Sequence, residues 1–251
     1  MLRKRIVFTL IYDDGFFCQS RNFRLQRVGD IKWLENNYKF QKIAFSIDEL
    51  IVINATRGEK NLSKFTKILD RLVDNVYIPI SAGGGVSSLE DAKLLFNHGA
   101  DKLIINTALF KNTNLISNIV KYYGKQSIIA SIDYKDNEVF ISDGRKKAGP
   151  YLEQYVKQIE LLGVGEIYLN SIEKDGTGFG YDLNTIELIA DKINTPLIVA
   201  GGAGNQQHLL KGIKTKGVSA IATANLFNFI GESLPKARQH LIQNGANLVE
   251  W

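Results

Sequence analysis

Asp133 is the residue of this sequence best placed for acid–base chemistry. It ends an apolar run, Ser127–Asp133, that is typical of a buried strand. In the first half of the chain the corresponding run, Arg5–Ile11, ends in isoleucine. Two facing carboxylates can share proton transfers, whereas an isoleucine side chain neither donates nor accepts a proton. Ile11 should also make the surroundings of Asp133 more apolar, which raises the cost of ionising that carboxyl.

Two glycine-rich turns are the second feature of the sequence that is suited to binding a ligand. Gly83-Gly84-Gly85 and Gly201-Gly202 each follow a short apolar run. Glycine lets backbone N–H groups approach an anion closely, and a helix that follows presents its positive end. Tight turns alone would also explain either glycine cluster. Because the pattern occurs twice, we expect two phosphates at opposite ends of one ligand.

The elements that position these residues alternate between β-rich runs and amphipathic stretches. Ser88, for example, is placed to cap the helix that follows it. Eight such alternations in 251 residues predict one closed (β/α)8 barrel that spans residues 1–251. The expected strands cover residues 5–11, 47–54, 77–82, 102–106, 127–133, 165–170, 195–200 and 218–222. Lys135, Lys146 and Lys147 flank an expected long loop, which is either a substrate loop or a solvated one.

The chain also repeats itself. Residues 79–85 match 196–203, residues 108–110 match 225–227, and residues 48–54 match 165–171. The offset is about 117 residues in all three pairs. We interpret the repeat as two half-barrels of four units each, which places equivalent loops on opposite sides of the barrel mouth.

Four charged residues open predicted strands, namely Arg5, Glu49, Lys102 and Glu166. Charges at the start of barrel strands are costly unless they are paired. Two cations and two anions at one level of the barrel can neutralise one another. Surface ion pairs of little energetic value are the alternative.

Composition excludes several classes of function. The net charge of +5 suits an anionic ligand, but the lysines are scattered, so we expect no nucleic-acid partner. Apolar runs are shorter than the ~20 residues of a membrane span, and no signal peptide is expected. A single cysteine, Cys18, fits a reducing cytoplasm. The three histidines lack ligand spacing, and Asp14-Gly15 is typical of a turn, so we expect no metal or cofactor.

Several short motifs together resemble the cyclase subunit of imidazole glycerol phosphate synthase, the HisF family. The resemblance runs from Met1 to about Phe229 in nearly one register. It implies a (β/α)8 barrel that receives ammonia through its centre from a HisH-type glutaminase. The ammonia then attacks a bisphosphorylated ribulosyl nucleotide, which yields imidazole glycerol phosphate and an aminoimidazole ribotide. The motifs include Asp14-Gly15, Gly99-Ala-Asp-Lys102, Ile105-Asn-Thr107, Ser131-Ile-Asp133, Ser171-Ile172, Asp175-Gly-Thr177 and Gly201-Gly-Ala-Gly204.

Carried over residue by residue, the resemblance is uneven. It makes Asp133 one catalytic aspartate but puts Ile11 in place of the other. A loop lysine of the family is Gln19, and an acid after the second strand is Asn54. The resemblance assigns phosphate or substrate binding to Gly84, Gly85, Asn106, Thr107, Ser171, Asp175, Gly176, Gly202 and Asn225, the last in place of a serine. It makes Arg5, Glu49, Lys102 and Glu166 an ammonia gate, with Asp101 beside them on the glutaminase face.

These substitutions favour a diverged paralogue over a housekeeping cyclase. The resemblance suggests an ammonia-accepting subunit that serves a separate sugar amidotransferase, which installs acetamidino groups on surface glycans. A genuine synthase of histidine biosynthesis is the first alternative. A barrel without catalysis that anchors and activates the glutaminase is the second.

Overall fold

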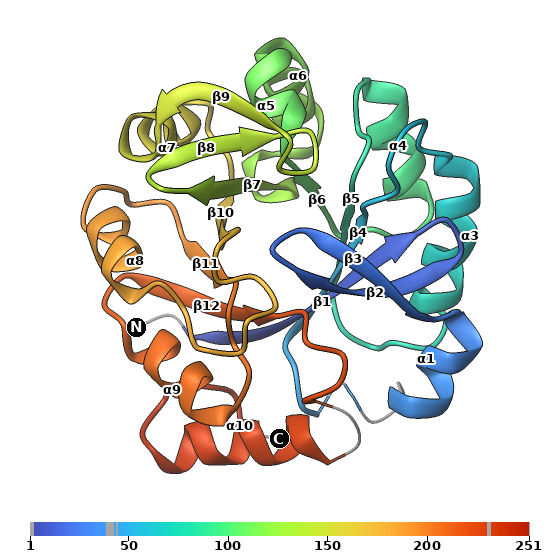
Figure 1. Cartoon of the computed structure of the whole chain (residues 1–251). Coiled ribbons are helices and arrows are strands. Elements are labelled where there is room, and N and C mark those ends of the chain that lie inside the picture. The colour runs from blue at the N-terminus through green and yellow to red at the C-terminus, as the bar shows by residue number, and fades with distance from the viewer. Residues whose placement is uncertain (1–2, 39–42, 44, 230–231, 251) are drawn as a thin grey trace.

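Eight parallel strands close into a barrel in the computed structural model, which describes residues 3–38, 43, 45–229 and 232–250. They pair in the order β10, β11, β12, β1, β4, β5, β6, β7, and β10 pairs with β7 to close the ring. The predicted (β/α)8 fold is therefore confirmed (Figure 1). The barrel strands are β1 (Arg5–Asp13), β4 (Glu49–Asn54), β5 (Ile80–Gly83), β6 (Lys102–Ile105), β7 (Ile128–Lys135), β10 (Glu166–Ser171), β11 (Leu197–Ala200) and β12 (Val218–Thr223).

Helices surround the barrel and bury one face each against the outer side of the strands (Figure 1). Ser88 caps α4 as expected, because its side chain accepts a hydrogen bond from Asp91 N–H while the Asp91 carboxylate accepts one from Ser88 N–H. The helices are α1 (Ile31–Tyr38), α3 (Leu62–Val73), α4 (Leu89–Asn97), α5 (Thr107–Lys111), α6 (Thr113–Tyr123), the 3₁₀ turn η1 (Lys125–Ser127), α7 (Leu152–Leu161), α8 (Leu183–Ala190), α9 (Gln206–Lys214) and α10 (Ser233–Gln243).

The barrel strands are apolar on both faces, since one face packs on the helices and the other fills the barrel. The inner cluster comprises Val7, Ile51, Ile104, Ile129, Tyr168, Ile198, Ala200, Ala220 and Ala222. It lies between two polar levels. Charged residues open the strands below it, and the carboxyl ends of the strands carry the polar residues of the mouth above it.

Two antiparallel hairpins were not predicted. They are β2 (Phe16–Arg21) with β3 (Arg24–Gly29), and β8 (Glu138–Ile141) with β9 (Lys146–Tyr151) (Figure 1). The prediction of a long loop flanked by Lys135, Lys146 and Lys147 was wrong. Lys135 ends β7, the two other lysines begin β9, and β8 lies between them. Each hairpin follows the first strand of a half-barrel, in keeping with the repeat.

The tips of the two hairpins meet over the mouth. A β-carbon added to Gly144, in the β8–β9 turn, would lie 2.5 Å from Cδ2 of Phe23, in the β2–β3 turn. Arg57, in the loop after β4, donates a hydrogen bond of 2.9 Å to the Phe23 carbonyl. The hairpins therefore form part of the wall of the mouth.

Candidate functional site

A cavity of about 670 Å³ opens at the carboxyl ends of the barrel strands. In (β/α)8 barrels this end carries the reactive residues. The cavity is lined by Ile11, Asp133, both glycine turns and the tips of both hairpins, and it reaches down to Thr9 and Tyr168 inside the barrel. The structure thus brings together the residues that the repeat placed on opposite sides of the mouth.

Asp133 lies at the wall of this cavity and is buried. The side-chain amides of Asn170 and Asn106 donate hydrogen bonds of 3.2 and 3.1 Å to its two carboxylate oxygens. Burial raises the pKa of the Asp133 carboxyl to about 7, and the Asn170 hydrogen bond opposes that rise. A carboxyl with this pKa can exchange protons near neutral pH.

No second acid is arranged to work with Asp133 among the described residues of the mouth. Ile11 lines the cavity with a side chain that cannot transfer a proton. Asp13, the nearest alternative in sequence, does not line it and bonds instead to Arg27 Nε at 3.0 Å. The lining carboxylates Asp143 and Asp175 are held by Lys60 and Ser20 respectively.

The turn after β5 has the backbone geometry that an anion site requires. Gly84 and Gly85 have φ of +93° and +106°, and a β-carbon at Gly84 would lie 2.1 Å from the Asn54 carbonyl oxygen. These two residues therefore have no side chain of their own that could cover the N–H groups of this turn. Asn106 holds Asp133, and the Thr107 hydroxyl accepts a hydrogen bond of 3.1 Å from Ser142 N–H in the β8–β9 turn.

The turn after β11 is its counterpart on the opposite side. Gly202 has φ of +103°, and a β-carbon there would lie 2.1 Å from the Gly180 carbonyl oxygen. Asp175 accepts hydrogen bonds from Ser20 Oγ (2.5 Å) and Phe23 N–H (3.0 Å), so this carboxylate anchors the β2–β3 hairpin. Gly176 lies directly under that hairpin, since a β-carbon would be 1.9 Å from the Ser20 carbonyl oxygen.

Ser171 and Asn225 complete the predicted substrate set. Ser171 is buried, and its hydroxyl accepts a hydrogen bond of 3.4 Å from Lys174 N–H. It is absent from the residues that line the cavity, whereas Asn225 lines it. The Asn225 side-chain oxygen accepts hydrogen bonds from the N–H groups of Phe227 and Asn228.

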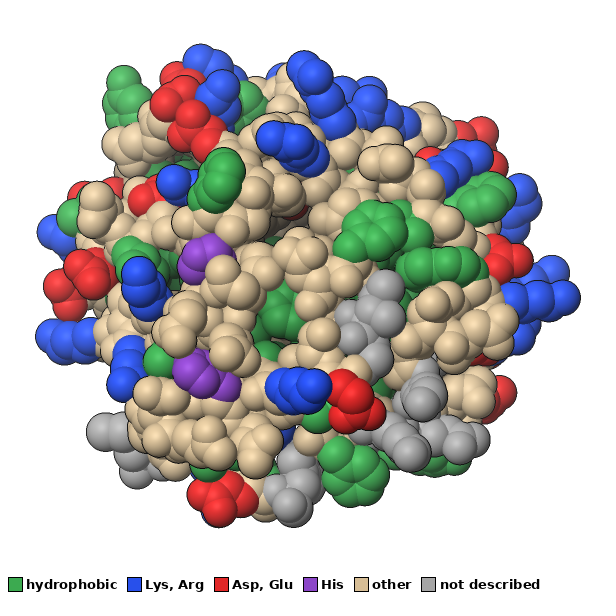
Figure 2. All heavy atoms as spheres, turned by 60° about the horizontal axis from the view of Figure 1, so that its bottom comes forward, with side chains coloured by type: hydrophobic (Ala, Val, Ile, Leu, Met, Phe, Trp, Pro, Cys, Tyr) green, Lys and Arg blue, Asp and Glu red, His purple; other side chains and the backbone are tan. Residues whose placement is uncertain are grey.

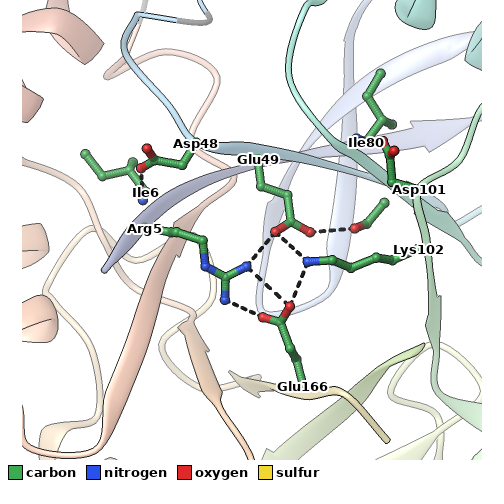
Figure 3. Close-up of polar contacts among 9 residues, drawn as sticks. Arg5, Ile6, Asp48, Glu49, Ile80, Asp101, Lys102 and Glu166 are labelled. Atoms are coloured by element: carbon green, nitrogen blue, oxygen red, sulfur yellow. Dashed lines mark hydrogen bonds and ion pairs between the residues drawn. The ribbon is translucent and has the colours of Figure 1, made fainter. Parts of the chain in front are cut away.

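The four charges that open the strands form a closed ring at the opposite end of the barrel (Figure 3). Lys102 Nζ lies 3.0 Å from Glu49 Oε2 and 2.7 Å from Glu166 Oε1. Arg5 bonds to the same two carboxylates, at 2.8 Å for Glu49. Ser81 Oγ donates a further hydrogen bond of 2.6 Å to Glu49. The predicted pairing at one level is therefore what the structure shows.

Burial and the ion-pair partners shift the pKa of Glu166, a member of this ring, in opposite directions. Burial alone would raise the pKa of the Glu166 carboxyl, but hydrogen bonds and charges from Arg5 and Lys102 hold that pKa below its ordinary value. Asp101 lies beside the ring but outside it, because its carboxylate accepts a hydrogen bond of 2.8 Å from Ile80 N–H (Figure 3). The ring consequently has two positive and two negative charges in balance.

Full-length relatives support the resemblance of the motifs. A family described as "Histidine biosynthesis protein" matches residues 28–232. A protein of Parasynechococcus marenigrum (strain WH8102), provisionally named imidazole glycerol phosphate synthase subunit hisF2, is 41% identical and covers 100% of this chain and 95% of its own length. The imidazole glycerol phosphate synthase subunit HisF of Hydrogenobaculum sp. (strain Y04AAS1) is 35% identical and covers 99% of both chains. The HisF subunit of Pyrobaculum aerophilum is also 35% identical, over 93% of this chain and 92% of its own.

The chain belongs to the HisF family. It is a HisF-type cyclase subunit by descent, as the motifs predicted. On the face shown in Figure 2, basic side chains are spread among acidic ones and form no single basic patch. This agrees with the scattered lysines of the sequence. Among the described residues, no group of three or more His, Cys, Asp or Glu side chains could hold a metal ion, and no helix is long and apolar enough to cross a membrane.

Several residues of the HisF-type mouth were not identified from the sequence alone. Lys60 donates hydrogen bonds to the Asn54 carbonyl (2.8 Å) and to Asp143 (3.1 Å), which joins the β4 loop to the β8–β9 turn. Inside the barrel, the hydroxyl groups of Thr9 and Tyr168 lie 3.1 Å apart. The position of Lys60 shortly after a barrel strand could have indicated that it lies at the mouth. Its partner Asp143, in a distant hairpin, could not be predicted from the local sequence.

Proposed function

We propose that this HisF-family chain is the ammonia-accepting subunit of a glutamine-dependent amidotransferase, with impaired cyclase chemistry. One contrast supports the proposal. The charged ring at the bottom of the barrel has all its partners, whereas at the mouth Ile11 faces the cavity in place of an acid. The other lining carboxylates, Asp143 and Asp175, are held by Lys60 and Ser20. The bottom of the barrel is thus suited to receive ammonia, and the mouth is less suited to cyclise a substrate.

The partner in this proposal is a HisH-type glutaminase that docks over the charged ring. Large apolar side chains are exposed in segments that lead into barrel strands at the ring end. They are Phe45, Tyr77, Tyr122 and Leu161, of which Tyr77 is 73% and Leu161 is 87% exposed. Exposed aromatic and aliphatic groups near a balanced set of charges are characteristic of protein interfaces. Asp101, also exposed, would lie at the same interface.

The proposed loss of cyclase activity follows from the chemistry of one missing group. A positioned acid or base contributes ~10²–10⁴-fold to a proton-transfer reaction. Ile11 provides none, and Asn54 places an amide where the family pattern has an acid. The ammonia would then be passed on, and we propose a sugar amidotransferase of surface-glycan synthesis in the cytoplasm as its recipient. The likeness to a protein named hisF2 supports a paralogue of the housekeeping enzyme.

A genuine imidazole glycerol phosphate synthase remains the second candidate. Two observations favour it, namely the pKa of Asp133 at about 7 and the full-length similarity to proteins named HisF. In that case Asp133 alone would carry the proton transfers, and both glycine turns would hold the phosphates of the nucleotide.

Co-sedimentation with the cognate glutaminase tests the proposal. We expect a complex, and stimulation of glutamine hydrolysis in it. Lys102→Glu should weaken both, because it changes the net charge of the ring and leaves two carboxylates facing a third. Lys157→Glu, on the exposed face of α7, is the matched control. If no complex forms with the unaltered chain, the proposal of ammonia transfer fails.

A further inference from the structure

Two hydroxyl groups lie together inside the HisF-type barrel, beside its apolar inner cluster. Tyr168 belongs to that cluster but ends in a hydroxyl group, which lies 3.1 Å from the hydroxyl of Thr9. Both residues are buried, and both line the lower part of the mouth cavity. The pair therefore forms part of the floor of the cavity. The members of the inner cluster that do not line the cavity are Val7, Ile51, Ile129, Ile198 and Ala220.

Both hydroxyl residues lie on strands that begin in the charged ring and end at the mouth. Side chains two residues apart on a strand point to the same face of the sheet. On β10, Tyr168 lies between Glu166 of the ring and Asn170 of the mouth. On β1, Thr9 lies two residues before Ile11. A small molecule that moves along the barrel axis from the ring to the mouth consequently passes this pair.

The hydroxyl pair has hydrogen-bonding capacity to spare. Each hydroxyl has one proton and two lone pairs, and the hydrogen bond between them uses only one of the two protons. Neither Thr9 nor Tyr168 has a second side-chain partner in the part of the chain that the structure describes. A buried donor without an acceptor is costly. The pair therefore favours a third, small group that can both accept and donate a hydrogen bond.

The surroundings of the pair favour an uncharged ligand. An ion would lose its hydration among the aliphatic side chains of the inner cluster, which is far more costly than the transfer of a neutral molecule. Burial raises the pKa of the Tyr168 hydroxyl far above its ordinary value, although the Thr9 hydrogen bond opposes that rise. Tyr168 therefore keeps its proton near neutral pH and remains a donor. Water and ammonia both meet these conditions, and ammonia is the molecule that the proposed function moves along this axis.

We infer that Thr9 and Tyr168 form a binding site for one molecule of uncharged ammonia at the floor of the mouth. The inference rests on the proposed ammonia transfer and adds to it a site between the ring and Asp133. Ammonia accepts a hydrogen bond from the spare O–H and donates one to a hydroxyl lone pair, whereas the aliphatic side chains offer neither. Ser131, the partner of Tyr168 in the β7–β10 pairing, also lines the cavity and leads from this site toward Asp133.

Nuclear magnetic resonance of the isolated full chain, labelled with ¹³C at its threonine methyl groups, tests the site with ammonium chloride as the probe. Much of the probe is uncharged ammonia at pH 9.5 and little of it at pH 8. The Asp133 carboxyl, with its pKa of about 7, is ionised at both values. Relative to sodium chloride at the same pH, we expect ammonium chloride to shift the Thr9 methyl signal, and to shift it more at pH 9.5 than at pH 8.

Two tyrosine variants separate the site from general effects of a lost hydroxyl. Tyr168→Phe should weaken ammonia binding about fivefold, the usual value of one hydrogen bond between neutral groups. Tyr181→Phe is the matched control. It also removes a buried hydroxyl, but one that belongs to the outer core and donates a hydrogen bond of 2.9 Å to the Ala222 carbonyl. Its Thr9 methyl signal should respond to ammonia as in the unaltered chain.

The source of the transferred nitrogen tests whether the site lies on the route. In the complex with the glutaminase, unlabelled glutamine and ¹⁵N-ammonium chloride compete as nitrogen donors in the residual cyclase reaction. Mass spectrometry of the imidazole glycerol phosphate gives the share from each. We expect mostly glutamine nitrogen with the unaltered chain. The ratio of glutamine to ammonium nitrogen should fall about fivefold in Tyr168→Phe and in Thr9→Val, and stay unchanged in Tyr181→Phe.

The possible outcomes distinguish this inference from the proposed function. Equal shifts of the Thr9 methyl signal in ammonium and sodium chloride would mean that water alone occupies the pair, and would overturn the inference. Equal ammonia binding by Tyr168→Phe and Tyr181→Phe would overturn it too, as would an unchanged nitrogen ratio in both Tyr168→Phe and Thr9→Val. If no complex forms, or if the unaltered complex uses ammonium nitrogen from solution, the proposed ammonia transfer fails instead. The isolated chain alone then decides whether ammonia binds at the pair.

Discussion

Lys102→Met is the perturbation that most directly probes the charged ring. The substitution keeps a flexible side chain of similar length and removes the ammonium group that joins Glu49 to Glu166. Both carboxylates retain Arg5, and Glu49 also retains Ser81. The ring then changes from balanced to one net negative charge inside the barrel end.

The size of the effect follows from burial. Removing one partner of a fully buried pair costs about 3–5 kcal/mol, because the other charge stays desolvated. Glu49 is 2% exposed but Lys102 is 19% exposed, so some solvent reaches the pair. We therefore expect a loss of about 2–3 kcal/mol in the free energy of unfolding. With an unfolding entropy of about 2.1 cal/mol/K per residue, this corresponds to a Tm lowered by about 4–6 °C.

Differential scanning calorimetry at pH 7 provides the measurement, with Lys157→Met as the control. Lys157 forms an exposed pair with Glu153 at 2.9 Å, and loss of such a pair costs only ~0.3–0.5 kcal/mol. Its Tm should fall by about 1 °C or less. If Lys102→Met and Lys157→Met lowered the Tm equally, the ring would be an ordinary surface ion-pair network, and our reasoning would be refuted.

Three further outcomes are expected. The folded-state pKa of Asp133 is about 7, above its unfolded value of 3.8, so the parent chain loses stability as the pH rises between these values. In urea titrations, the free energy of unfolding of Asp133→Asn should rise by about 2–3 kcal/mol relative to that of the parent chain between pH 5 and pH 8. A difference in free energy that stays constant with pH would contradict the burial of an ionisable group. Ile11→Asp alone should restore less than about tenfold of any missing cyclase rate in a steady-state assay, because Gln19 and Asn54 also depart from the family pattern and such groups are not additive; full recovery would show that the acid alone was missing. Gly176→Ala should speed proteolysis of the β2–β3 hairpin, since a β-carbon would lie 1.9 Å from the Ser20 carbonyl oxygen, whereas Gly163→Ala, with open space around it and a similarly positive φ, should not.

The barrel could be predicted from the sequence because its strands bury both faces. Runs such as Ser127–Asp133 are apolar without alternation, and each is followed by a helical pattern. The charged ring was predictable for a related reason. An apolar run begins at each of four charged residues, and the parallel pairing of the strands brings their first residues to one end of the barrel. These residues are Arg5, Glu49, Lys102 and Glu166.

The two hairpins could not be predicted in the same way. The β2–β3 turn has positive φ at both Asn22 and Phe23, as a two-residue hairpin turn requires, and the β8–β9 turn has positive φ at Ser142, Asp143 and Gly144. Phe23 in particular has no intrinsic preference for φ of +61°, so only tertiary contacts explain its conformation. The contact of Gln19 with Leu226 spans 207 positions and joins residues without any shared local pattern.

We propose that the mouth has lost half of its acid–base pair while the route for ammonia has been kept. The most direct measurement is formation of imidazole glycerol phosphate from the ribulosyl nucleotide with excess ammonium, which bypasses the glutaminase. The HisF subunit of Hydrogenobaculum sp. (strain Y04AAS1), assayed alongside, supplies the reference rate. We expect this chain to be slower by at least ~10²-fold, the contribution of one general acid or base. A rate equal to that of the reference subunit would contradict the claim and make the chain an ordinary cyclase.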